Sequence, residues 1–245
     1  MAGLSSERQE SKLIDDIKSA IKKNKNNAIT VIAGKTIIPG VIDAYKFKGR
    51  QVGGSEPYTD VVLEIMTLDK NKTLNLSLKG ESAPSLAGGG LKGIELAVPG
   101  IAKKFMLAAF DYLVKEKKLN VGDRVPDVYA KISKVDKIKL VVGNIQMGGP
   151  IDYMYIGPMN VVSRYDVKKN QITLNGKIVE SKEYAEKTDL YFRLRARRED
   201  QRFDPAAKDN KGIPKIYGKS IRGDSAGRIV ITDSVPQQAL IINLT

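Results

Sequence analysis

The sequence predicts an α/β protein in which helices flank a mixed sheet and a β-rich C-terminal part follows. Three features indicate this class. Apolar residues recur at helical spacing near the N-terminus, short apolar runs separated by turn residues fill residues 28–79, and a second helical run covers residues 101–118. Beyond residue 147 the apolar runs are short and bounded by turn residues. We therefore expect a core of residues 1–147 and a β-rich basic region of residues 148–245.

The first helix is expected to begin at Ser6, with Gln9 completing a capping box three residues later. Leu13 and Ile17 follow at helical spacing on the face expected to enter the core. Glu10 shares this apolar face because it precedes both residues at helical intervals. Such a carboxylate either lies at the frayed edge of the core or points at a positive charge.

Several strands are expected between and after the two helices. They cover residues 28–33, 36–41, 59–66, 73–79, 129–133 and 137–147. The glycine-glycine-proline sequence at 148–150 is expected to mark the domain boundary. Asn175 and Gly176 lie between two short apolar runs, which predicts a type I′ hairpin.

Composition excludes several kinds of active site. The chain has no cysteine and no histidine, so disulfides, thiolate zinc sites and histidine-based catalysis are excluded. A metal site would have to consist of oxygen ligands, which suit magnesium, manganese or calcium. No apolar run reaches the roughly 18 residues of a membrane span, and the N-terminus lacks the apolar core of a signal peptide. We expect a protein that stays inside a cell or is packaged in a virion.

The chain is strongly basic, with 41 basic and 28 acidic residues and a formal net charge of +13. Such an excess favours binding to polyanions through phosphate contacts. Solubility alone is the alternative explanation. Attachment to a membrane surface is disfavoured, because no long basic amphipathic helix with large aromatic residues is present.

The candidate catalytic residues lie in the region from Thr59 to Lys79. Strand alternation places Asp60 on one face of the first strand, and Ser77 and Lys79 on one face of the second. If the turn centres between residues 69 and 70, Asp60 lies opposite Lys79 and Val62 opposite Ser77. A carboxylate that holds a divalent cation, with a nearby lysine, suits phosphodiester hydrolysis. The alternative is an ordinary cross-strand ion pair.

A helix with Glu10, a strand, Thr59-Asp60 on a second strand and Lys79 on a third resemble the PD-(D/E)xK, or restriction-endonuclease-like, nuclease superfamily. The resemblance covers roughly residues 6–145, and its closest form is the bacteriophage version in which serine replaces the second motif acid. It implies that Asp60 binds Mg²⁺ or Mn²⁺, that Lys79 is the catalytic lysine, and that Glu10 is the glutamate of the first helix. The implied substrate is DNA.

Ser77 stands where this resemblance expects an acid, so Glu10, Glu64 or Glu81 would have to complete the metal site. The first hypothesis is therefore a metal-dependent, phage-encoded deoxyribonuclease. The second is a non-catalytic DNA-binding or virion structural protein on the same fold. A structural protein with no nucleic-acid role is a third, and the sequence leaves a homo-oligomer open.

A further basic surface is expected between Tyr191 and Arg198. Phe192 and Leu194 take one face of this strand, and three arginines take the other. The residues expected to contact DNA phosphates are Arg193, Arg195, Arg197, Arg198 and Arg202, together with Lys92 in the small-residue loop of residues 82–93. For the strand the alternative is a solvated edge protected by charge. For the loop the alternatives are nucleotide binding and plain chain reversal.

Overall fold

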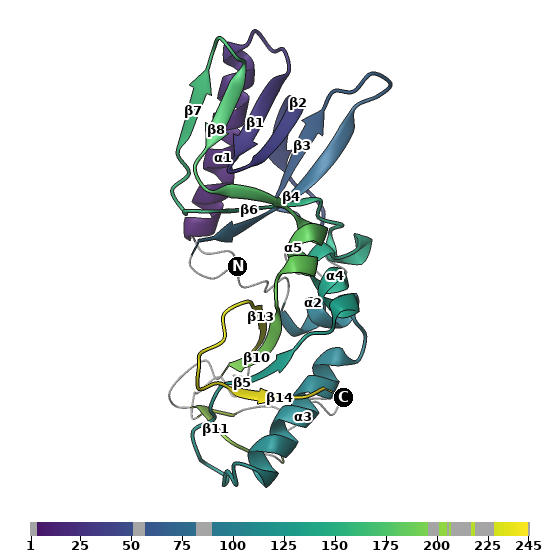
Figure 1. Ribbon diagram of the computed structural model, residues 1–245, viewed down its shortest axis with the longest axis vertical. Helices are drawn as coiled ribbons and strands as arrows, with labels where there is room; N and C mark the ends of the chain where they lie inside the picture. Colours follow the sequence, from purple (N-terminus) through teal and green to yellow (C-terminus); the bar gives the residue numbers. More distant parts are fainter. Residues whose placement is uncertain are drawn as a thin grey trace. The chain divides into compact units, whose positions relative to one another are not determined.

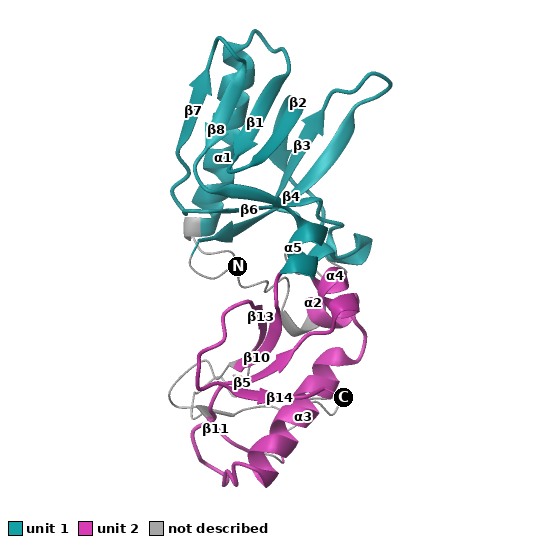
Figure 2. Cartoon of the chain, in the orientation of Figure 1, with its two compact units in different colours: residues 1–84, 141–187 teal, residues 85–140, 188–245 magenta. Residues whose placement is uncertain are grey.

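The computed structural model describes residues 4–50, 57–81, 90–195, 201–204, 206, 217–218 and 228–244. The chain forms two compact units, each assembled from two separate segments (Figure 2). The first unit comprises residues 1–84 and 141–187, and the second comprises residues 85–140 and 188–245. The expected boundary at residue 147 does not coincide with this division. Residues 148–150 lie inside the first unit, where they lead the chain into a strand of its sheet.

In the described part of the first unit, eight strands form one sheet in the order β7-β8-β1-β2-β3-β4-β6-β9 (Figure 1). The strands are β1 (Ile29–Ala33), β2 (Thr36–Lys46), β3 (Val61–Ile65), β4 (Lys72–Gly80), β6 (Tyr153–Gly157), β7 (Ser163–Asp166), β8 (Gln171–Leu174) and β9 (Lys177–Glu180). Neighbouring strands are antiparallel except for two parallel pairs, β1 with β8 and β4 with β6. The predicted mixed sheet is confirmed.

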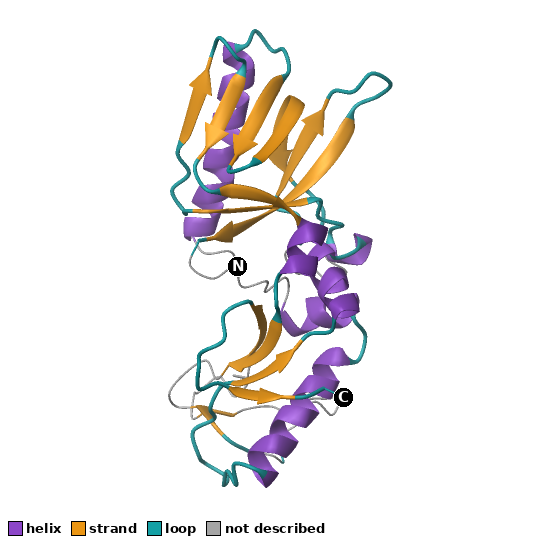
Figure 3. Cartoon of the chain, in the orientation of Figure 1, coloured by secondary structure: helices purple, strands orange, loops and turns teal. Residues whose placement is uncertain are grey.

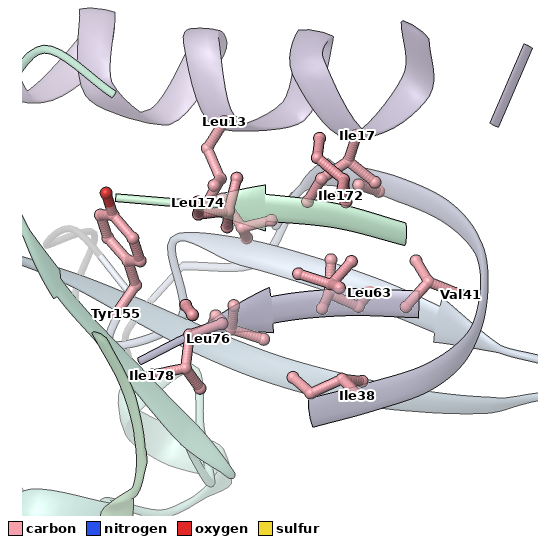
Figure 4. Packing of buried hydrophobic residues seen from close by; sticks show 14 of the residues in the cluster. Leu13, Ile17, Ile38, Val41, Leu63, Leu76, Tyr155, Ile172, Leu174 and Ile178 are labelled. Carbon is pink, nitrogen blue, oxygen red and sulfur yellow. The ribbon is translucent and has the colours of Figure 1, made fainter. Parts of the chain in front are cut away.

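Helix α1 (Leu4–Lys23) covers one face of this sheet. Leu13 and Ile17 are completely buried, and they point into a core that includes Leu63 and Leu76 (Figure 4). Burial of each such aliphatic side chain contributes roughly 1.5–3 kcal/mol. The apolar spacing of the helix therefore predicted its buried face correctly.

The predicted capping box at Ser6 is wrong, because the helix already begins at Leu4. Gln9 instead is buried, and its side-chain amide donates to the carbonyl oxygens of Gly157 and Pro158 at 3.2 and 3.1 Å. A residue expected to cap its own helix thus fastens α1 to the end of β6.

Strand β2 bends sharply and thereby curves the sheet. Its first half pairs with β1 and its second half with β3, and the register shifts between Val41 and Asp43. Gly40 has φ +77°, and a Cβ there would lie 3.0 Å from the carbonyl oxygen of Met66. The curvature brings β9, at one end of the strand order, against β1 and β2. Thr36 Oγ1 donates to the carbonyl oxygen of Ile178 at 2.6 Å.

The predicted hairpin at Asn175-Gly176 is wrong. The strands on either side pair elsewhere, β8 with β1 and β7, and β9 with β6. Gly176 has φ +85°, but Asn175 does not have the positive φ that a type I′ turn also requires. Asn175 instead accepts hydrogen bonds from Tyr155 Oη at 2.7 Å and from the Val162 backbone at 2.8 Å. These long-range hydrogen bonds determine the conformation of the turn.

The second unit contains a four-stranded sheet in the order β13-β10-β5-β14. Its strands are β5 (Val128–Lys131), β10 (Tyr191–Arg195), β13 (Arg228–Thr232) and β14 (Leu240–Ile242), and a short pair is formed by β11 (Gln201–Arg202) and β12 (Tyr217–Gly218). The described part of this unit also contains helices α2 (Gly90–Ala97) and α3 (Ile101–Lys115) and most of a third helix at residues 134–142 (Figure 3). The predicted helix at residues 101–118 is confirmed, and Phe105 of α3 stacks on Phe192 of β10 with ring centroids 5.5 Å apart.

The predicted strand at residues 137–147 is wrong. This segment forms helix α4 (Lys134–Val142) and the short 3₁₀ helix η1 (Ile145–Met147). The backbone N–H of Asp136 donates to Ser133 Oγ at 3.1 Å, and Ser133 Oγ donates to the Asp136 carboxylate at 2.7 Å. This serine-to-acid spacing is a helix start signal, but the continuous apolar run that follows is equally compatible with a strand. Helix α5 (Ser181–Lys187) follows β9.

Candidate functional site

Asp60 is held at the beginning of β3 by the two residues that precede it. The backbone N–H of Tyr58 donates to the carbonyl oxygen of Met147 at 2.9 Å. Both the N–H and the Oγ1 of Thr59 donate to the carbonyl oxygen of Gly148, at 3.1 and 2.6 Å. Gly148 adopts φ +74°, and a Cβ there would lie 2.5 Å from Pro57 Cβ. The glycine that was expected to mark a domain boundary therefore positions Asp60.

The Asp60 side chain takes part in the pairing of β3 with β4. Its Oδ2 accepts hydrogen bonds from the Leu78 backbone at 2.6 Å and from Ser77 Oγ at 3.1 Å. Its backbone N–H donates to the carbonyl oxygen of Leu76 at 2.9 Å. One carboxylate oxygen thus satisfies a backbone donor of β4 and a buried hydroxyl, and each such charge-assisted bond contributes roughly 1.5–3 kcal/mol.

The observed register corrects the predicted one by two residues. Val62 lies opposite Asn75, and not opposite Ser77. Asp60 consequently contacts Ser77 and does not face Lys79. Because the side-chain period of a strand is two, a shift by two residues leaves all three side chains on the predicted face.

Lys79 lies two residues beyond Ser77 on that face and is half-buried. Within the described part of the chain, its ammonium has no ion pair and no hydrogen bond. Lys79 is therefore a candidate for contact with an anion such as a phosphate.

Glu10 points at a positive charge, which settles the choice left open by the sequence. The Lys46 ammonium lies 2.9 Å from its Oε1 and 3.2 Å from its Oε2. The hydrogen bond with Glu10 raises the pKa of Lys46, burial opposes this rise, and the charges of Glu10, Glu7 and Asp60 add to it. The residue after Lys46, Phe47, donates its backbone N–H to the Asp60 carbonyl oxygen at 3.1 Å. Glu10 and Lys46 thus form an ion pair on the α1 side of the sheet, whereas the carboxylate of Asp60 contacts Ser77 and Leu78.

The remaining predicted ligands do not complete a metal centre. Glu64 accepts from Asn71 Nδ2 at 2.8 Å, and it lies four residues along β3 from Asp60, or about 13 Å. Glu81 is exposed beyond the end of β4. Among the described residues, no three acidic side chains are grouped closely enough to hold one metal ion.

The predicted arginine surface is only partly described. Strand β10 lies inside its sheet, so the alternative of an edge strand is wrong. Arg193 Nε donates to Asp127 Oδ2 at 2.9 Å, and its guanidinium lies 5.7 Å from the centroid of the Tyr129 ring. Arg202 is half-buried in β11. Arg197, Arg198 and the side chains of Arg195 and Lys92 lie outside the described residues.

Five exposed lysines lie near the C-terminal end of α1, and the sequence alone did not predict that they belong to one surface. The lysine cluster consists of Lys22, Lys23, Lys25, Lys168 and Lys169. Lys22 and Lys23 end α1, Lys25 lies in the turn that follows it, and Lys168 and Lys169 lie in the turn between β7 and β8 (Figure 1). The backbone N–H of Thr30, at the start of β1, donates to the carbonyl oxygen of Asn170 at 2.9 Å and joins the two segments. In the part of the chain that the structure describes, none of the five lysines forms an ion pair.

Comparison of the chain with protein families, curated proteins and solved structures gives no match in any of the three. The resemblance to PD-(D/E)xK nucleases therefore stays a prediction from the sequence. In the described ranges, no helix is long and apolar enough to cross a membrane.

Proposed function

We propose that this protein binds DNA through its phosphates and does not cut it, on a core built like that of a nuclease. The observation that carries this proposal is the lysine cluster. Like charges close together repel one another, and the negative end of a helix offsets only about half an elementary charge. Five ammonium groups therefore exceed what the end of α1 can balance. DNA phosphates would neutralise the excess and release counterions.

The strand arrangement supports the nuclease-like core. After α1 and β1, strand β3 lies between β2 and β4 and is antiparallel to both, with Asp60 directly before β3 and Lys79 on β4. An N-terminal helix followed by strands that present an aspartate and then a lysine is compatible with the resemblance. Ser77 and Leu78 hydrogen-bond to Asp60, and Lys46 is bound to Glu10. Both acids at this site are thus engaged by donors of the protein itself, which supports binding without cleavage.

The test measures binding to a short fluorescent DNA duplex by anisotropy over a range of salt concentrations. Removing two phosphate contacts in Lys168→Gln/Lys169→Gln should lower the slope of log affinity against log salt by about 2. A matched control, Lys12→Gln/Lys187→Gln, removes the same charge from lysines of the same unit that are paired with Asp16 and Glu183. Equal effects of the two variants, or binding by wild type that does not depend on salt, would contradict the proposal. An RNA competitor tests the choice of DNA.

Metal-dependent DNA cleavage is the second candidate, and the shared face of Asp60 and Lys79 favours it. Wild type is incubated with plasmid and linear DNA in Mg²⁺ or Mn²⁺. Cleavage that disappears in both Asp60→Ala and Lys79→Ala would establish this activity and refute the non-catalytic proposal. Salt-sensitive binding without cleavage would leave the first proposal standing.

A further inference from the structure

We infer that strand β7 pairs with β7 of a second copy of this chain, antiparallel and centred on Tyr165, so that the two eight-stranded sheets become continuous. Strand β7 stands at one end of the strand order, and within the described part of the chain no further strand lies beside it (Figure 1). The pairing involves only this edge of the sheet and does not require DNA.

The hydrogen bonds of β8 determine which backbone groups of β7 point outward. The carbonyl oxygen of Asn170 accepts from a backbone N–H of β1 at 2.9 Å, so even-numbered residues at β8 point toward β1 and odd-numbered ones toward β7. In agreement, the backbone N–H of Asn175 donates to the carbonyl oxygen of Val162 at 2.9 Å. Even-numbered residues of β7 therefore point toward β8, and the N–H and C=O groups of Ser163 and Tyr165 point out of the sheet.

These outward groups restrict how two copies can pair. Hydrogen bonds form only where outward-pointing residues meet each other, so a two-fold symmetric pairing centres on one residue that meets its own copy. A pairing centred on Arg164 would place two arginines opposite each other, and one centred on Asp166 would place two aspartates opposite each other. Like charges in these positions are destabilising. In the pairing centred on Tyr165, Arg164 of each copy lies opposite Asp166 of the other.

The two charged side chains are placed to meet their counterparts. Ser163 Oγ donates to Asp16 Oδ2 of α1 at 2.7 Å, so odd-numbered side chains of β7 take the α1 face, and Arg164 and Asp166 take the opposite face. Arg164 is exposed, and it forms no ion pair with the described residues. Asp166 Oδ1 accepts from the Lys168 backbone at 2.9 Å. Its Oδ2 is therefore the oxygen that would accept from the arginine of the second copy.

Two exposed apolar residues flank β7. Val162 is 58% exposed and Val167 is 67% exposed. In the pairing centred on Tyr165, Val162 lies opposite Lys168 of the second copy and Val167 opposite Ser163, so both valines lose contact with water. Edge strands usually carry charges that keep other chains away, but the alternating charges of β7 attract a second copy. Because a strand of four residues buries less than the roughly 1,200 Å² of a stable interface, we expect a weak dimer.

The chain contains no cysteine, so single cysteines can map the pairing in the full chain. Tyr165→Cys should form a disulfide-linked dimer under mild oxidation, because the two paired Cα atoms would lie about 5.5 Å apart, within the range that a disulfide spans. Arg164→Cys should not, because the two copies of this residue would lie diagonally, roughly 7–8 Å apart. Non-reducing electrophoresis measures the linked fraction, and circular dichroism establishes that each variant is folded.

Sedimentation equilibrium measures the association without a cross-link. Wild type should dimerise with a dissociation constant below about 1 mM. Arg164→Asp should raise this constant about tenfold or more, because two attractive cross-strand pairs become two repulsive ones. The matched control Lys177→Asp makes the same change of charge on β9, at the other end of the strand order, and should associate like wild type.

Three results would overturn the inference. The first is wild type that stays monomeric up to about 1 mM. The second is cross-linking of Arg164→Cys as readily as Tyr165→Cys when both are folded, since the register would then be different. The third is an equal dissociation constant for Arg164→Asp and Lys177→Asp. If Tyr165→Cys does not fold, sedimentation of wild type and of the two aspartate variants still decides.

Discussion

The substitution Gly148→Ala should lower the unfolding free energy of the first unit, because Gly148 holds the segment that positions Asp60. The residue has φ +74°, a conformation that costs an alanine about 1–2 kcal/mol. The new Cβ would also lie 2.5 Å from Pro57 Cβ and 3.1 Å from Pro57 Cα. Forced overpacking of this kind typically costs about 1–3 kcal/mol. The expected loss of unfolding free energy is therefore about 2–5 kcal/mol.

A matched control separates the two contributions. Gly122 has φ +93°, and a Cβ there meets nothing within 4 Å. Gly122→Ala should therefore lose only the conformational part, about 1–2 kcal/mol. Urea denaturation gives the total loss for each variant, and amide hydrogen exchange with mass spectrometry assigns the loss to a unit.

Hydrogen exchange should also detect a local change at Tyr58 and Thr59, whose N–H groups donate to the carbonyl oxygens of Met147 and Gly148. Both amides should exchange faster in Gly148→Ala and at the wild-type rate in Gly122→Ala. Equal losses of stability in the two variants, with unchanged exchange at residues 58 and 59, would refute the argument that Gly148 supports the Asp60 segment.

Three further outcomes are expected. Burial raises the pKa of Tyr155 to about 12, with a smaller contribution from the charge of Glu81. The unfolded chain releases the Tyr155 proton near pH 10. The neutral phenol should therefore contribute fully to the stability of the fold below about pH 10, and this contribution should be lost as the pH rises to about 12. Denaturation of wild type and Tyr155→Phe across this pH range measures the loss. Tyr58 Oη is buried and has no hydrogen-bond partner in the described structure, so Tyr58→Phe should preserve or raise the melting temperature, and a clear fall would reveal a missed partner. Ser77→Ala should lower the unfolding free energy by about 1.5–3 kcal/mol, the contribution of one charge-assisted hydrogen bond, because Asp60 retains its bond from Leu78; a loss well above about 3 kcal/mol would contradict this division of roles.

The sequence by itself determined much of the local structure. The helical spacing of Leu13 and Ile17 predicted the buried face of α1, and the apolar run after Ile101 predicted α3. Strand alternation placed Asp60, Ser77 and Lys79 on one face. Periodicity sufficed in these cases because a side chain's direction follows from its position within its own element. A register error of two residues does not change that direction.

Only the tertiary structure decided which elements meet. The two-residue connection at Asn175-Gly176 has the local signature of a hairpin, but hydrogen bonds from Tyr155 and Val162 direct its strands to different partners. The lysine cluster exists because β1 pairs with β8 across more than 130 residues of sequence. Glu10 forms an ion pair with Lys46 because α1 packs on β2. Contacts of this kind depend on which buried surfaces fit together, and the spacing of residues within one segment carries no information about that fit.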